Sequence, residues 1–73
     1  MPSNDRMICI TKIDQSLLAV DKIETYLADI AAVLAEDEKR FQRKHPELRD
    51  KVDMVAQIAL QTEQALKLLR SEF

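Results

Sequence analysis

The chain has 73 residues, a net charge of -2 and no glycine. A chain this short forms one small domain at most, and without a disulfide or a metal its own core supplies little stability. Cys9 is the only cysteine and His45 the only histidine, which excludes an intramolecular disulfide and falls short of a zinc-ligand set. The lack of glycine excludes a glycine-rich phosphate-binding loop.

The first eleven residues are predicted to form an N-terminal arm, residues 1–11. The segment 7–11 is rich in β-branched side chains and could extend as a short strand. A disordered tail, or a tail that packs on the helices, is the alternative. Thr11 and Asp14 have the spacing of residues that cap a first helical turn, so a helix is expected to begin near residue 12. Asp14 or Ser16 could act as the cap instead.

The first helix is predicted over residues 12–43 and carries a wide apolar stripe. Apolar residues recur every seven positions, and other apolar residues flank them on both sides. At 100° per residue the stripe covers roughly 200° of the helix circumference, which is more than one antiparallel helix can cover. The repeating positions are Ile13, Val20, Leu27, Leu34 and Phe41, with Ile23 and Ile30 placed between them.

Pro46 is predicted to separate this helix from a second one over residues 46–71. Its ring clashes with the carbonyl of Gln42, and it disfavours the α conformation at His45. Proline nevertheless suits the first turn of a new helix. Residues 12–73 are therefore predicted to form an all-α, two-helix antiparallel hairpin of the coiled-coil type, which completes a bundle by oligomerisation or partner binding. A single kinked helix is the alternative, because a tight reversal without glycine is unusual.

Charge is unevenly distributed along the chain. Residues 13–38 contain seven acids and one lysine, whereas residues 39–51 contain six cations and two acids. The simpler interpretation is a solvated helix end with favourable ion pairs. The alternative is a nucleic-acid contact, which the interleaved acids and the lack of neighbouring aromatic residues disfavour.

Nothing in the sequence predicts an enzyme, a cofactor site or a metal site. At the turn, His45 is expected to be a solvated or capping imidazole, because no partner nucleophile is evident. Glu36, Asp37 and Glu38 are consecutive, so they should point in different directions around the helix and fail to converge on one cation. The composition also lacks an apolar run of the roughly 20 residues that cross a membrane. We expect a soluble cytoplasmic protein without membrane contact.

The surplus apolar surface predicts a protein interface. Either a different protein or a second copy of the chain could cover it, and the isolated chain is expected to be a homodimer or a larger homo-oligomer. The candidate interface residues are Leu27, Ile30, Val33, Leu34, Val52, Val55, Ile58, Leu66 and Leu69.

Three apolar segments, LADIAAVL (27–34), VAQIAL (55–60) and ALKLL (65–69), lie on either side of a polar turn. This arrangement resembles the small co-chaperones of the type III secretion needle subunit, in outline over residues 13–69. In that family the hairpin packs on a larger tetratricopeptide-like chaperone, and the two together keep the needle subunit soluble in the bacterial cytoplasm. The long charged turn, residues 36–44, and the N-terminal arm depart from the family pattern.

The resemblance implies a protein-binding adaptor or co-chaperone that stabilises a larger helical chaperone. Two other functions are consistent with the same pattern. The chain could be a self-associating helical bundle with a structural or regulatory role, since a second copy covers apolar surface as well as a different protein does. It could also be a small dimer that binds nucleic acid through the basic turn.

Overall fold

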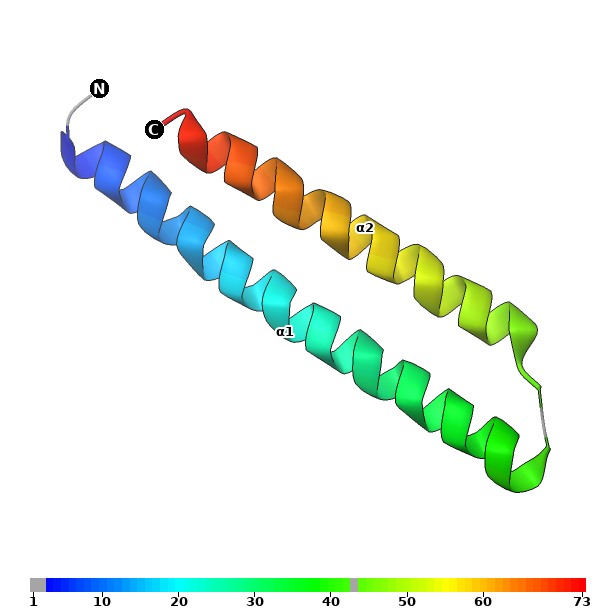
Figure 1. Cartoon of the computed structure of the whole chain (residues 1–73). Coiled ribbons are helices and arrows are strands. Elements are labelled where there is room, and N and C mark those ends of the chain that lie inside the picture. The colour runs from blue at the N-terminus through cyan, green and yellow to red at the C-terminus, as the bar shows by residue number, and fades with distance from the viewer. Residues whose placement is uncertain (1–2, 43) are drawn as a thin grey trace.

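The computed structural model describes residues 3–42 and 44–73. It consists of two antiparallel helices, α1 (Ser3–Phe41) and α2 (Pro46–Ser71), which lie side by side (Figure 1). The predicted all-α hairpin is confirmed, and the alternative of a single kinked helix is excluded. Neither helix of the described chain is apolar enough over a sufficient length to cross a membrane.

The hairpin is a thin rod. Its principal extents are 59 × 15 × 11 Å and its radius of gyration is 17.2 Å, whereas a compact chain of this length has a radius of gyration of about 11 Å. Each helix has only one neighbour, so most side chains remain in contact with solvent. Among the described residues only Ile13, Val20 and Ala59 are buried.

The two helices meet along a seam of buried and half-buried side chains. These residues recur at intervals of three, four or seven, which is the heptad spacing of an antiparallel coiled coil. Val20 and Ala59 are buried at its middle, and Ile13 is buried nearer the free ends of the helices. The seam comprises Ile10, Ile13, Leu17, Val20, Glu24, Leu27 and Leu34 of α1, and Val52, Ala56, Ala59, Glu63 and Leu66 of α2.

The prediction of a nonhelical arm over residues 1–11 is wrong for residues 3–11, which belong to α1; residues 1–2 lie outside the described part of the chain. Ile10 is half-buried and precedes Leu17 by one heptad, so the seam continues into this segment. Met7 and Ile8 remain exposed, so the partial burial of Ile10 is what offsets the small helix-propensity cost of β-branched residues here. Ser16 is not a cap, because its hydroxyl donates a 2.9 Å hydrogen bond to the carbonyl of Lys12 inside the helix.

The turn solves the problem of reversing the chain without glycine. Gln42 has a φ of 55°, in the left-handed region that glycine normally occupies at the end of a helix. Pro46 then starts α2 as predicted, and the amide of Arg49 donates the first helical hydrogen bond to the carbonyl of His45 at 3.0 Å. The predicted end of the first helix at residue 43 is two residues too late, since α1 ends at Phe41.

We expect Gln42→Gly to stabilise the hairpin. The left-handed conformation costs a non-glycine residue roughly 1–2 kcal/mol, and the greater freedom of glycine in the unfolded chain cancels part of the gain. The net increase in the free energy of unfolding should be at most about 1 kcal/mol, measured by urea denaturation. Gln42→Ala is the matched control and should show no such increase. Equal stability of the two variants would contradict a strained turn.

Acidic side chains at the end of α1 hold the start of α2. His45 Nε2 lies 2.7 Å from Asp37 Oδ2, and its backbone amide donates to Glu38 Oε1 at 3.4 Å. Arg49 Nη1 donates to Glu38 Oε2 at 3.1 Å. The His45 imidazole is therefore half-buried against Asp37 and makes no side-chain cap hydrogen bond, whereas the sequence predicted a freely solvated or capping imidazole.

At the other end of the rod, Arg70 of α2 pairs with Asp14 of α1. Its Nε and Nη2 donate to the two carboxylate oxygens at 2.7 and 3.4 Å. The hydrogen bonds to Asp14 and the negative charge of its carboxylate raise the pKa of the Arg70 guanidinium above its ordinary value. Because both side chains are half exposed, the pair positions the helix ends more than it stabilises the fold.

Candidate protein interface

The two flanks of the seam have opposite character. One heptad position of α1, beside the seam, is occupied in the middle of the helix by Ile23 and Ile30, each 47% exposed, and nearer the helix ends by Ser16 and Asp37. The corresponding position on the other flank is occupied by Asp14, Asp21 and Ala28. The first flank therefore presents large apolar side chains to solvent, and the second presents acids and small residues.

The apolar flank contains a groove of about 300 Å³ between the helices. The α1 side is formed by a short run of leucine and isoleucine, and the α2 side by leucine and valine. The only charged residue in its lining is Lys51. The groove is lined by Leu27, Ile30, Leu34, Leu48, Lys51, Val52 and Val55, and we call this set the apolar groove.

The structure brings five of the nine predicted interface residues together in the apolar groove. Leu27, Leu34 and Val52 are half-buried and form its floor with the seam, while Ile30 and Val55 stand at its rims, 47% and 45% exposed. The rim side chains are the ones that can contact another molecule without disturbing the hairpin. The floor side chains also hold the two helices together.

The other four predicted residues lie outside the apolar groove. Ile58 and Leu69 are exposed further along α2, at 55% and 47%, and Leu66 is half-buried in the seam. Val33 lines a separate hollow with Phe41, Glu36, Asp37 and Arg40. Sequence periodicity assigned all nine to one surface because it treats each helix as a single stripe.

Two groove residues, Leu48 and Lys51, were not among the predicted interface residues. Leu48 precedes Val52 by four residues and Val55 by seven, so its helical spacing could have identified it. Lys51 gave no such signal. Its position only becomes apparent once the turn places the first turns of α2 opposite Ile30 and Leu34.

The total surface of the hairpin is large for its mass. It exposes 6028 Å² to solvent, whereas a compact chain of 8.4 kDa exposes about 4,600 Å². The excess is about 1,400 Å², more than the roughly 800 Å² that each partner buries in a protein interface of standard size. Among the described residues, fifteen large hydrophobic side chains are at least 42% exposed and contribute to this surface. The hairpin thus offers enough surface for a stable interface.

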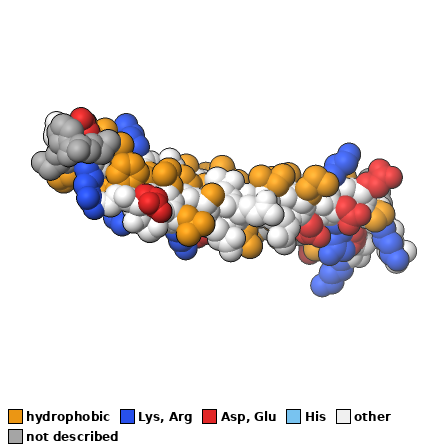
Figure 2. All heavy atoms as spheres, turned by 90° about the horizontal axis from the view of Figure 1, so that it is seen from above, with side chains coloured by type: hydrophobic (Ala, Val, Ile, Leu, Met, Phe, Trp, Pro, Cys, Tyr) orange, Lys and Arg blue, Asp and Glu red, His pale blue; other side chains and the backbone are white. Residues whose placement is uncertain are grey.

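Charged side chains lie toward both ends of the rod and leave its middle largely hydrophobic or uncharged on the side that Figure 2 shows. Several of these charges are paired. Arg40 lies 3.6 Å from Glu36, and Arg49 lies 3.1 Å from Glu38. Of the consecutive acids 36–38, Glu36 pairs with Arg40, and Asp37 and Glu38 both contact His45. Arg43, one of the predicted basic residues, lies outside the described part of the chain.

The described residues contain no group of three or more histidine, cysteine or acidic side chains arranged to hold a metal ion. Cys9 is a half-buried thiol on α1. The chain matches no protein-family model, no curated protein and no solved structure. The function is therefore inferred from the apolar groove and the residues around it.

Proposed function

We propose that this hairpin is a protein-binding adaptor whose apolar groove packs against a larger helical protein. The observation that supports it is the exposure of Ile30 and Val55 on either rim of a groove lined almost entirely by apolar side chains. Apolar grooves between helices bind the apolar face of another helix, with large side chains as anchors.

The kind of partner is inferred from the resemblance to the small co-chaperones of the type III secretion needle subunit. On that basis the partner is a larger tetratricopeptide-like chaperone of the bacterial cytoplasm, and the hairpin is a co-chaperone that helps to keep a type III secretion needle subunit soluble. Tetratricopeptide repeats are stacked helix pairs. Their surfaces have the helical form that a groove between two helices accommodates.

Self-association is the main alternative function, and the same surface favours it. Two hairpins that face each other through their apolar grooves form a four-helix bundle. The nucleic-acid alternative has less support, because Arg40 and Arg49 of the basic turn are paired with acids of the same chain. Cations already paired within the protein neutralise phosphates less effectively.

Site-specific photo-crosslinking in cells of the source organism tests this function. A photoreactive phenylalanine replaces Ile58, an exposed apolar residue three positions after Val55 on α2, or Gln57, which lines a hollow on the opposite flank of the seam. The two sites are adjacent in sequence, but neighbouring helical side chains point in directions about 100° apart. Each site therefore detects molecules bound to a different flank of the seam. We expect a covalent adduct with a larger helical protein from position 58 and little from position 57, identified by mass spectrometry.

Two outcomes would contradict the adaptor proposal. An adduct of twice the chain's mass, formed from position 58 without any larger product, would establish the self-associating bundle instead. Equal adducts from both positions would show that the apolar flank is not the binding surface. Arg40→Gln serves as the turn control and should leave the pattern of adducts unchanged.

A further inference from the structure

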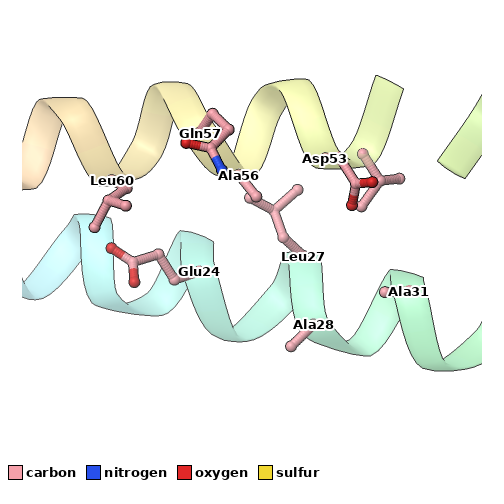
Figure 3. A pocket seen from close by; sticks show the side chains of 9 residues that line it. Glu24, Leu27, Ala28, Ala31, Asp53, Ala56, Gln57 and Leu60 are labelled. Carbon is pink, nitrogen blue, oxygen red and sulfur yellow. The ribbon is translucent and has the colours of Figure 1, made fainter. Parts of the chain in front are cut away.

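Two glutamates lie within the otherwise apolar seam. Glu24 of α1 and Glu63 of α2 both occupy heptad positions that face the opposite helix, and both are half-buried. The Glu24 carboxylate extends from α1 toward α2 beside Leu60 (Figure 3). Its Oε1 atom is shielded from solvent and accepts no hydrogen bond among the described residues. A buried carboxylate oxygen without a partner is costly unless the group takes up a proton.

The charges around Glu24 are mostly of its own sign. Glu63 faces it from α2, and Asp21 lies about one helical turn earlier on α1. Asp53 of α2 lines a hollow between the helices together with Glu24. Lys67 is the one nearby cation, and it is paired with Glu63 at 3.3 Å. Desolvation of the Glu24 carboxylate and the negative charge of Glu63 raise the pKa of Glu24 above its ordinary value of 4.5, and the charge of Asp21 adds to the effect.

We propose that Glu24 and Glu63 form a proton-sensitive contact that controls how firmly the middle of the hairpin is closed. With one proton between them, the two carboxyl groups hydrogen-bond across the seam. With both ionised, they repel each other and the helices are held less firmly at this point. The contact depends on the hairpin alone, so it is independent of which molecule occupies the apolar groove.

The direction of the pH effect follows from proton binding. The folded chain holds a proton at Glu24 more tightly than the unfolded chain does, because the folded-state pKa is raised. The resulting stabilisation is fully present below pH 4.5 and is lost as the pH rises through the folded-state pKa. Stability should therefore fall as the pH rises above 4.5, in contrast to the behaviour of a salt-bridged carboxylate.

Thermal unfolding of the full chain, followed by circular dichroism from pH 5 to pH 8, tests this proposal. We expect the wild-type midpoint to fall as the pH rises, and Glu24→Gln to remove most of that fall and to have the higher midpoint at pH 7. Asp29→Asn removes an exposed acid of α1 outside the seam and should keep the wild-type dependence. His45 and Asp37 are present in all these chains, so the contact between them does not contribute to the differences between the variants.

A nuclear magnetic resonance titration of the Glu24 carboxyl carbon gives a second measurement. We expect its midpoint to lie above 4.5 in the wild type and to move down in Glu63→Gln, because the facing carboxylate has been removed. An unchanged midpoint in Glu63→Gln would overturn the proposal. So would equal pH dependence of unfolding in the wild type and Glu24→Gln.

Discussion

Val20→Asp should prevent the hairpin from forming. Val20 is 7% exposed at the middle of the seam, where an unpaired carboxylate costs about 3–5 kcal/mol. A chain of this length has a total free energy of unfolding of roughly 4–11 kcal/mol. The substitution therefore removes much or all of the stability, and the helical circular dichroism signal at 25 °C should be largely lost.

Leu18→Asp is the matched control for this experiment. Leu18 lies two residues earlier on α1 but is 66% exposed, so its replacement leaves the contact between the helices intact. We expect its helical signal and its unfolding midpoint to remain close to those of the wild type. Loss of structure in Leu18→Asp, together with tolerance of Val20→Asp, would mean that α1 packs through a different face.

Val55→Asp should separate binding from folding. Val55 is 45% exposed at the rim of the apolar groove, so the new carboxylate stays hydrated in the free hairpin. When a partner covers the groove, the carboxylate must lose much of its water, a cost that an ion pair with Lys51, one helical turn earlier, offsets only in part. We expect the affinity for the cross-linked partner to fall roughly 30-fold or more, with the helical signal retained. Titration calorimetry measures this loss.

Gln64→Asp adds the same charge to an exposed position of α2 outside the apolar groove. It should bind the partner as the wild type does, within about threefold, since charges at a distance from an interface change affinity little. If both variants lost affinity equally, charge alone would explain the effect. If Val55→Asp unfolded the chain, Val55 would belong to the seam and not to the interface.

The hairpin itself was predictable from sequence, because a long heptad pattern and a proline at the boundary are strong local signals. Pro46 begins α2 where predicted. The start of α1 was not predictable, because residues 7–11 favour strands intrinsically and become helical through a long-range contact. Ile10 is half-buried along the seam, and this burial depends on a helix that is distant in the sequence, so residues 7–11 alone do not predict it.

The seam was predicted only in part. From Val20, the next seam residue can lie three or four positions further on, and both spacings fit a heptad. Hydrophobicity favoured Ile23, three positions on, but the structure places Glu24 in the seam and leaves Ile23 47% exposed. The more apolar of the two side chains is thus on the outside, which is the arrangement expected if another molecule covers it.

A repeating apolar seam has a weakness that the polar contacts at the two ends of the rod correct. Two helices with heptad repeats can slide past each other by one repeat, about 10 Å, and still meet apolar side chains. Such a shift would also separate Glu24 from Glu63. It would break the pair between Asp14 and Arg70 at one end and that between Glu38 and Arg49 at the other. These end contacts therefore select one sliding position, and with it the single alignment of α1 and α2 that assembles the apolar groove.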